Sequence, residues 1–215
     1  MSVDINRKGI FRIVPIQNLE YNLQNGLFCK NAGRTDDGFI TIGSKEIISE
    51  RDRRIVKCYP DTVVNDYVPF YFSKRTPMLY NIITGHGVPK FSQEDIVYLC
   101  FKLTEMAVDD FQWCFTDGNA AKKITKYATS LDLINELDWH SILTTDFRDE
   151  NADGDEDRIR KKHSEFLIKG HVPSSYIKYI VVLNENKQKE VEAILEKLGL
   201  DIEVKINPDK KYYFL

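Results

Sequence analysis

The chain has 215 residues, of which 42% are hydrophobic and 29% are charged, and its formal net charge is −3. This composition is ordinary for a globular protein and excludes the disordered and fibrous classes. A chain of this length can bury a sizeable core, and we expect a single domain over residues 1–215. Non-specific binding of polyanions needs a surplus of lysine and arginine, so any nucleic-acid contact must come from a local groove.

Cysteine usage and the amino terminus bear on location. The four cysteines, at positions 29, 58, 100 and 114, are widely spaced and form no CxxC pair, which is typical of reduced thiols in a cytoplasmic protein. Residues 1–8 lack the apolar core of a signal peptide, and the sequence has no apolar run of about eighteen residues, so we expect no membrane association. The sequence has no phosphate-binding glycine loop and no metal-ligand cluster, and we expect no metal.

The opening of the chain predicts a strand and a short helix. Residues 9–15 are typical of a strand ended by proline, with Arg12 between apolar neighbours. Arg12 is then either an edge-strand surface residue or an inward-facing ligand for an anion or amide. An amphipathic helix is expected from Asn18 to Asn25, ended by Gly26.

Residues 30–57 combine a long loop with a run of cations. Residues 30–48 are polar and contain several glycines, and loops of this length in compact domains are usually functional or ordered by a ligand. Residues 50–57 hold Arg51, Arg53, Arg54 and Lys57. These cations indicate either a solvated helical face or a clamp for pyrophosphate or a nucleic-acid backbone.

An aromatic segment follows at residues 67–80. It predicts a strand over 67–72, a turn over 73–77 and then a helix. The ordinary place for such rings is the core. However, Tyr71, Lys74, Arg75 and Tyr80 combine stacking faces with cations, as single-stranded nucleic acid or a nucleotide requires.

The second half of the chain predicts mostly strands. Residues 95–103 indicate a central strand buried on both faces. Residues 112–121 predict a strand that runs into a turn, which frees backbone N–H groups and places Asn119 near a strand end; the ordinary alternative is that Asn119 only caps this turn. Short helices broken near Asp138 are expected over 131–143. The remaining expected elements are a strand over 177–183, a helix over 185–198, and strands over 200–206 and 211–215. This order indicates an α+β (mixed α/β) protein.

Glu165 stands between a basic segment and an apolar strand. Residues 149–157 form an acidic loop that begins like a calcium loop but has Arg160 where a bidentate glutamate is needed. The basic residues 158–163 are expected to continue this loop as a mobile segment, and Glu165 then begins the strand 165–168, where a buried sheet opens to solvent. This position suits chemistry; the ordinary alternative is a solvated carboxylate paired with Lys162 or Lys169.

Three stretches of the sequence form a recognisable set. They are Tyr-Val-Pro-Phe-Tyr-Phe at 67–72 with Arg-x-Pro-Met-Leu-Tyr at 75–80, Phe-Thr-Asp-Gly-Asn-Ala at 115–120, and Ser-Glu-Phe-Leu at 164–167. Together they resemble the DarT family of DNA ADP-ribosyltransferase toxins. The likeness runs in order from Phe11 to the last expected strand. It implies an ADP-ribosyltransferase-like split mixed β-sheet with flanking helices, which binds NAD as co-substrate in a central cleft and transfers ADP-ribose to a base of single-stranded DNA.

The resemblance also implies residue roles. Glu165 matches the catalytic glutamate of the family, and Arg51 matches the arginine that serves NAD or base activation. The residues expected to contact NAD are Arg12, Asn18, Arg51, Tyr67 and Tyr71, and those expected to contact DNA are Lys74, Arg75, Tyr80, Asn119 and His163. A fixed carboxylate can stabilise the oxocarbenium character that develops when a glycosidic bond breaks.

Two positions depart from the family members compared, which have histidine on the opening strand and after the Thr-Asp pair. Arg12 and Asn119 occupy those places here. Thymidine is the expected target base, and guanine is the alternative. The resemblance further implies a macrodomain antitoxin that removes the mark, and we expect a monomer. The other hypotheses are an ADP-ribosyltransferase acting on RNA or protein, and a non-catalytic module that binds single-stranded nucleic acid.

Overall fold

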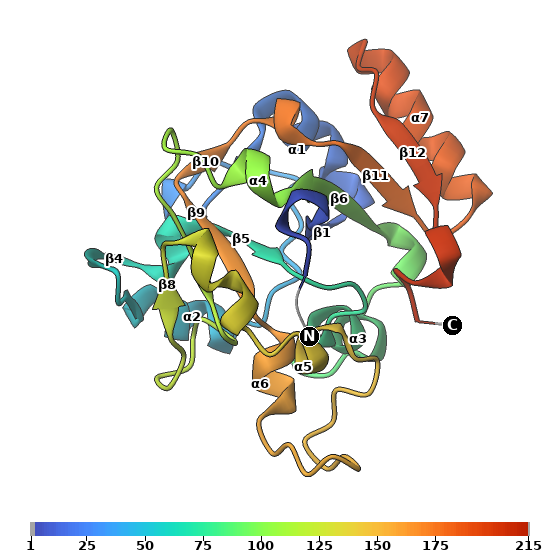
Figure 1. The fold of residues 1–215 in the computed structure, drawn as a ribbon. Coiled ribbons are helices and arrows are strands. Elements are labelled where there is room, and N and C mark those ends of the chain that lie inside the picture. Colours follow the sequence, from blue (N-terminus) through green and yellow to red (C-terminus); the bar gives the residue numbers. More distant parts are fainter. Residues whose placement is uncertain (1–2, 215) are drawn as a thin grey trace.

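The computed structural model describes residues 3–214, which form a mixed sheet flanked by helices (Figure 1). The sheet has eight strands in the order β12-β11-β6-β1-β5-β9-β7-β8, and its strand pairs are antiparallel except for β11 and β12. The strands are β1 (Gly9–Pro15), β5 (Tyr67–Tyr71), β6 (Ile96–Lys102), β7 (Trp113–Thr116), β8 (Tyr127–Ala128), β9 (Glu165–Lys169), β11 (Tyr179–Val182) and β12 (Glu203–Ile206). This arrangement confirms the predicted α+β class.

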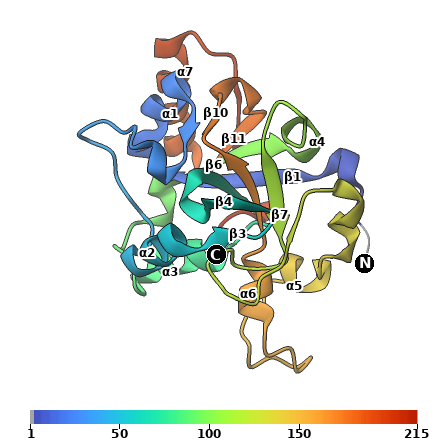
Figure 2. The ribbon, with the colours of Figure 1, turned by 90° about the vertical axis from the view of Figure 1, so that its left-hand side faces the viewer.

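Helices and two small strand pairs surround this sheet. The helices are α1 (Leu19–Asn25), α2 (Lys45–Arg53), α3 (Pro77–Thr84), α4 (Leu103–Met106), α5 (Trp139–Leu143), α6 (Arg158–Lys162) and α7 (Glu185–Leu198). The small pairs are β2 (Leu27–Phe28) with β10 (His171–Val172), and β3 (Ile55–Val56) with β4 (Tyr59–Val63). The loop before α6 projects from the body of the molecule (Figures 1 and 2).

The sheet is split between β1 and β5. Strand β1 pairs with β6 along its whole length, from Gly9 opposite Lys102 to Pro15 opposite Ile96. With β5, in the described part of the chain, it shares one pair, Phe11 opposite Tyr71. Beyond that pair the two strands diverge and leave a gap in the sheet.

The two faces of the sheet are covered differently. One face carries the largest hydrophobic cluster, which includes Phe70 and Phe166 and is covered by α1, α4, α5 and α7. The other face carries two smaller clusters, one under α3 and the carboxyl-terminal segment, the other under β3 and β4. Tyr71 and Glu165, which pair with each other, alternate with Phe70 and Phe166 and therefore lie on the second face, where the two smaller clusters meet.

Two predicted elements are wrong. Residues 158–162 form α6 instead of continuing the loop, because Asp153, Asp155 and Asp157 of the acidic segment pair with the cations of this helix. Residues 211–214 form no strand; Tyr212 and Tyr213 instead fill the cluster next to α3, and Leu215, the last residue of that predicted strand, lies outside the described residues. The four cysteines are free thiols.

Gly26 allows the chain to turn from α1 into β2. Its φ of 78° and ψ of −169° belong to a region that is essentially restricted to glycine. A β-carbon at this position would also lie 2.5 Å from the carbonyl oxygen of Val172 in β10. The turn therefore needs glycine for its conformation and for the close approach of β10.

We expect Gly26→Ala to lower the free energy of unfolding by about 3 kcal/mol, because it adds backbone strain and a steric clash. Gly199→Ala is the matched control: Gly199 ends α7 with a φ of 66°, and a β-carbon there would meet no atom within 4 Å. The control should lose about 1 kcal/mol from backbone strain alone. Urea unfolding measures both values, and equal losses would contradict the steric argument.

Candidate active site

Glu165 and Arg51 form a buried ion pair on the second face of the sheet, next to Tyr71, the residue at which β5 parts from β1. Nη1 of Arg51 lies 2.9 Å from Oε2 and 3.1 Å from Oε1 of Glu165. The Glu165 side chain is 4% exposed and that of Arg51 is 11% exposed. The ordinary alternative for Glu165, a solvated carboxylate paired with a neighbouring lysine, is therefore wrong.

The turn after β7 fixes Glu165 from the other side. The main-chain N–H of Ala120 donates to Oε1 of Glu165 at 3.2 Å. Thr116, the last residue of β7, accepts the main-chain N–H of Glu165 at its hydroxyl, at 3.0 Å, and donates that hydroxyl to the carbonyl of Gly118. The sequence predicts a turn with free N–H groups here, but it does not identify Thr116 or the Ala120 N–H as groups that position Glu165.

Helix α2 places Arg51. Ser44 caps its amino terminus, and the side-chain amide of Asn65 donates to the carbonyl of Ile48 and to the carboxylate of Asp52. Arg54, just after the helix, donates to the carbonyl of Ala121 at 2.8 Å and so links α2 to the turn that contacts Glu165. Both partners of the ion pair are thus tied to the same turn.

Arg51 also has an unused donor. Its Nη2 is buried and has no hydrogen-bond partner among the described residues. A buried guanidinium N–H without an acceptor is costly, so this atom is a ready donor for an anionic or hydroxyl group that enters the gap.

Arg12 and Tyr71 lie beside the ion pair. Arg12 donates from Nη1 to the carbonyl of Pro69 at 3.2 Å, across the gap between β1 and β5. Burial, followed by the charge of Glu165, raises the pKa of Tyr71 to about 12, so its phenol keeps its proton at neutral pH. Burial lowers the pKa of Arg12, while Tyr71 and Glu165 oppose that effect. Arg12 therefore faces the site and not the solvent.

His163 completes the group. Its ring centroid lies 6.5 Å from that of Tyr71, and its Nδ1 is 2.9 Å from the carbonyl of Ile159. Because a carbonyl can only accept, Nδ1 carries the proton and Nε2 is left as an acceptor. Burial lowers the pKa of His163, which favours this neutral form. We call Arg12, Arg51, Tyr71, His163 and Glu165 the Glu165 cluster.

Asn18 positions the long loop instead of pointing into the Glu165 cluster. Its side-chain amide donates to the carbonyl of Ile40 at 2.8 Å and accepts the main-chain N–H of Ile40 at 2.9 Å. The residue is 2% exposed, and its carboxamide is used by these two bonds. Asn18 thus fastens residues 30–48, and its expected contact with NAD stays a prediction.

Tyr67 is not part of the cluster either. It is 1% exposed and lies in the core under β3 and β4, four residues from Tyr71 along the same strand. Its hydroxyl is 2.9 Å from the hydroxyl of Thr62 and accepts from the side-chain amide of Gln112 at 2.9 Å. The expectation that Tyr67 contacts NAD is not supported, because both its ring and its hydroxyl are already occupied.

The residues expected to contact DNA are dispersed. Lys74 lies 3.9 Å from the ring centroid of Tyr212, and Arg75 donates to the carbonyls of Tyr213 and Lys210 and so anchors the carboxyl-terminal segment. Tyr80 is 45% exposed on α3. None of the contacts found in residues 3–214 joins these three side chains to Glu165.

Asn119 caps the turn after β7. Its side-chain oxygen accepts the main-chain N–H of Ala121 at 2.9 Å, and its own N–H donates to the carbonyl of Arg160 at 3.0 Å. The capping alternative, and not a free amide facing a base, describes this residue. Asn119 contributes by shaping the turn that presents the Ala120 N–H to Glu165.

Within residues 3–214, no group of three or more His, Cys, Asp or Glu side chains is placed to hold a metal ion. No helix of this part of the chain is both long and apolar enough to cross a bilayer.

Helix α6 carries a buried lysine next to the cluster. Lys162 is 2% exposed, and its Nζ donates to the carbonyls of Ile142 and Thr144 at 2.7 Å each. Burial, with smaller effects from Lys8 and Arg75, lowers its pKa to about 7. This lysine ties α6, and hence the residues leading to Glu165, to the end of α5.

Comparison with known proteins identifies relatives of this chain. The sequence model of the family described as "ssDNA thymidine ADP-ribosyltransferase, DarT" matches residues 11–214. A DNA ADP-ribosyl transferase of Escherichia coli is 34% identical over 94% of this chain and 93% of its own length. A DNA ADP-ribosyl transferase–DNA ADP-ribosyl glycohydrolase fusion protein of Thermosipho africanus is 29% identical over 97% of this chain, which spans 50% of the fusion.

Solved structures give the same result. Thermus sp. 2.9 DarT in complex with ADP-ribosylated ssDNA superposes with a TM-score of 0.85 at 27% identity, over 96% of both chains. The same protein in complex with NAD+ superposes with a TM-score of 0.82 at 26% identity, over 96% of this chain and 98% of that one.

The lowered pKa of Lys162 predicts a pH dependence of stability. Between about pH 7 and the ordinary lysine pKa of 10.5, the unfolded chain binds more protons at this residue than the folded chain, so stability should rise with pH over that window. Lys162→Met should flatten the rise. Urea unfolding midpoints at pH 7 and pH 9.5 measure this rise in stability, and Lys189→Met, at an exposed position, is the control. A rise as large in Lys162→Met as in the wild type would contradict the lowered pKa of Lys162.

Proposed function

This chain belongs to the DarT family, and we propose that it transfers ADP-ribose from NAD to thymidine in single-stranded DNA. The family match supports DNA ADP-ribosyltransferase activity with NAD as co-substrate. The description of the matching family names thymidine, which supports that base over guanine. The observation that carries the proposal is the buried Glu165–Arg51 pair beside the split in the sheet, with one guanidinium nitrogen of Arg51 unpaired among the described residues.

The two arginines beside Glu165, Arg51 and Arg12, offer donors that suit a dinucleotide. Arg51 Nη2 is a buried donor that lacks an acceptor among the described residues, and a pyrophosphate oxygen or a ribose hydroxyl would supply one. Arg12 spans the gap as a second guanidinium. Asn18 fastens residues 30–48 beside it through its bonds to Ile40. Arg12 and Arg51 are therefore the residues that we propose to bind NAD, with Tyr71 beside them.

We assign the chemistry to Glu165. The transfer breaks the bond between nicotinamide and C1′ of the ribose; nicotinamide leaves with the electron pair, C1′ bonds to a nitrogen of the base, and that nitrogen loses its proton. Glu165 is fixed by Arg51 on one side and the Ala120 N–H on the other, so its carboxylate can accept a ribose hydroxyl and stabilise the positive charge that develops. Tyr71 and His163 offer ring faces for the unstacked base.

The partner follows from the same family. We propose that the mark is removed by an ADP-ribosyl glycohydrolase of the macrodomain type, acting as antitoxin. Support comes from the Thermosipho africanus fusion, which joins a DNA ADP-ribosyl transferase to a DNA ADP-ribosyl glycohydrolase in one chain. The monomeric state, the single domain and the cytoplasmic location stay predictions.

The choice of base can be tested with oligonucleotides of deoxyadenosine that contain one thymidine, one guanosine or one cytidine. After incubation with the protein and NAD, intact-mass analysis should find one added ADP-ribose on the thymidine strand and none on the others. An adduct on the guanosine strand alone would replace thymidine by guanine. Release of nicotinamide without any adduct would favour an RNA or protein acceptor, and intact NAD would favour a binding module without chemistry.

Arg51→Lys should keep a cation but lose the planar guanidinium fork, in which Nη1 contacts both oxygens of Glu165 and Nη2 is left for the substrate. We expect kcat/KM for transfer to fall about 100-fold, the range seen when one preorganised donor is removed from an active site. Arg53→Lys, an exposed residue of the same helix, is the matched control and should retain the wild-type value. Wild-type kcat/KM in Arg51→Lys would contradict the role of the fork.

A further inference from the structure

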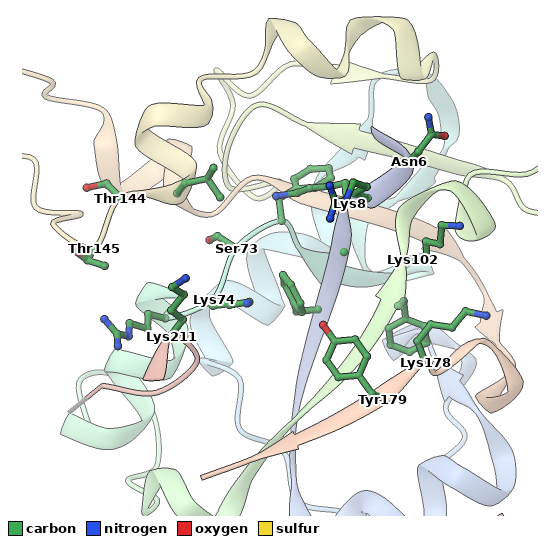
Figure 3. Close-up of a pocket in the computed structure, with 17 residues that line it drawn as sticks. Asn6, Lys8, Ser73, Lys74, Lys102, Thr144, Thr145, Lys178, Tyr179 and Lys211 are labelled. Carbon is green, nitrogen blue, oxygen red and sulfur yellow. The ribbon is translucent and has the colours of Figure 1, made fainter. Parts of the chain in front are cut away.

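A large cavity outside the Glu165 cluster lies at one end of the sheet (Figure 3). Its volume is about 730 Å³, and it does not include any residue of the cluster. Its lining comes from the ends of four neighbouring strands: residues 6–9 lead into β1, residues 73–75 follow β5, Lys102 ends β6, and residues 178–179 begin β11. We call this the basic cavity.

The charge of the cavity is one-sided. Seven cations line it and no carboxylate does, although acidic residues outnumber basic ones in the whole chain by 33 to 30. The cations at the rim have outside partners: Lys102 and Lys178 pair with Glu105, and Lys211 pairs with Asp209. That leaves Arg7, Lys8, Lys74 and Arg75 without a carboxylate partner among the described residues, and Arg75 is already bonded to main-chain carbonyls.

Lys8 and Lys74 are the two lysines among these four cations. In the described part of the chain neither lysine forms an ion pair. The Nζ of Lys8 lies 4.3 Å from the ring centroid of Trp139, and the Nζ of Lys74 lies 3.9 Å from the ring centroid of Tyr212. Burial, followed by repulsion from Lys74, lowers the pKa of Lys8 to about 8. In Figure 3 these lysines and Ser73 lie toward the middle of the cavity, with Thr144 and Thr145 on one side.

Ser73 gives an independent sign of a missing ligand. It is 4% exposed, and its hydroxyl is buried without a hydrogen-bond partner among residues 3–214. A buried hydroxyl normally has a partner. Ser73 lines the cavity together with the unpaired Lys8 and Lys74, and an anion with several oxygen acceptors, such as a phosphate, is the group that suits all three.

The cavity and Glu165 lie at the same end of the sheet. Glu165 begins β9 opposite Tyr71, the last residue of β5, and Ser73 follows Tyr71 by two positions. From β5 the cavity continues over the ends of β1 and β6 to β11. Neighbouring strands are about 4.8 Å apart, so this path is about 14 Å long, more than one phosphate needs.

Three aromatic side chains that pack on one another include two that lie close to cavity residues along the chain. Tyr80 packs edge-to-face on Phe147 and Phe214, with ring centroids 5.8 and 5.6 Å apart. Phe147 follows the cavity residue Thr145 by two positions, and Phe214 follows Lys211 by three. A groove of cations next to aromatic faces is the usual arrangement for binding single-stranded nucleic acid.

We propose that the basic cavity binds the backbone phosphates of the DNA strand next to the modified base, with Lys8, Ser73 and Lys74 as the central contacts. The proposal rests on the proposed function for its ligand. The strand then runs from Glu165 along the end of the sheet, and the cavity adds affinity without contacting the reacting atoms.

The test measures binding of fluorescently labelled single-stranded DNA by anisotropy, without NAD. Two strands are used: a trinucleotide centred on thymidine, and a 12-mer that contains it. The double variant Lys8→Gln/Lys74→Gln should bind the 12-mer about tenfold more weakly at low salt. The slope of the logarithm of the association constant against the logarithm of the salt concentration should become shallower by about 1.4, or 0.7 for each lost phosphate contact. Lys189→Gln on α7, which is exposed and does not line the cavity, is the control.

A merely structural role would weaken both strands equally, whereas the proposal predicts that the 12-mer loses its advantage over the trinucleotide. The melting temperature of the double variant should not fall, since the change removes two cations that repel each other. Ser73→Ala should also weaken binding of the 12-mer, by a smaller factor than the double variant. Unchanged 12-mer affinity and salt slope in the double variant would overturn the proposal.

Failure of the proposed function has a different signature. If the protein binds the 12-mer through Lys8 and Lys74 but never transfers ADP-ribose, the proposed function fails and the cavity assignment remains. If it transfers ADP-ribose but the double variant binds the 12-mer like the wild type, the cavity assignment fails and the proposed function remains.

Discussion

The ion pair between Glu165 and Arg51 is the interaction on which the arrangement of the site depends. Two charges this deeply buried are costly to desolvate, and removing one partner of such a pair typically costs about 3–5 kcal/mol. The fold meets that cost with neighbouring contacts: the Ala120 N–H on Glu165, Thr116 beneath it, and Arg54 between α2 and the same turn. The result is a carboxylate held in one orientation beside the split in the sheet. Stability of the fold alone would not require such a buried charge.

Much of the fold could be predicted because its long elements have clear periodicity. The strands at 9–15 and 96–102 and the helix at 185–198 follow directly from their patterns. The two-residue strands β2, β3, β8 and β10 have no pattern of their own and are defined by pairing alone: β2 with the distant β10, β3 with β4 and β8 with β7. Tyr212 and Tyr213 favour a strand by type, but packing against α3 and the strand ends decides their conformation.

The candidate site could be predicted in part. A glutamate at a strand end and a cation run at 50–57 indicate where charge gathers, but their pairing spans 114 positions and no local pattern reveals it. Residue type alone also does not show which side chains are engaged by contacts within the protein. Asn18 and Asn119 bind main-chain groups, and Tyr67 is in the core. Lys8 and Ser73 carry no motif at all. Their interest comes from being brought together, unpaired, by strands β1 and β5.

The central claim is that Glu165 performs the chemistry without being needed to bind NAD. The most direct measurement compares Glu165→Ala and Glu165→Gln with the wild type, using calorimetry for NAD binding and single-turnover transfer to a thymidine oligonucleotide. The account predicts that both variants bind NAD while transfer falls by about 10³-fold or more, the scale of losing a preorganised electrostatic group. Transfer at a rate comparable to that of the wild type in either variant would contradict it.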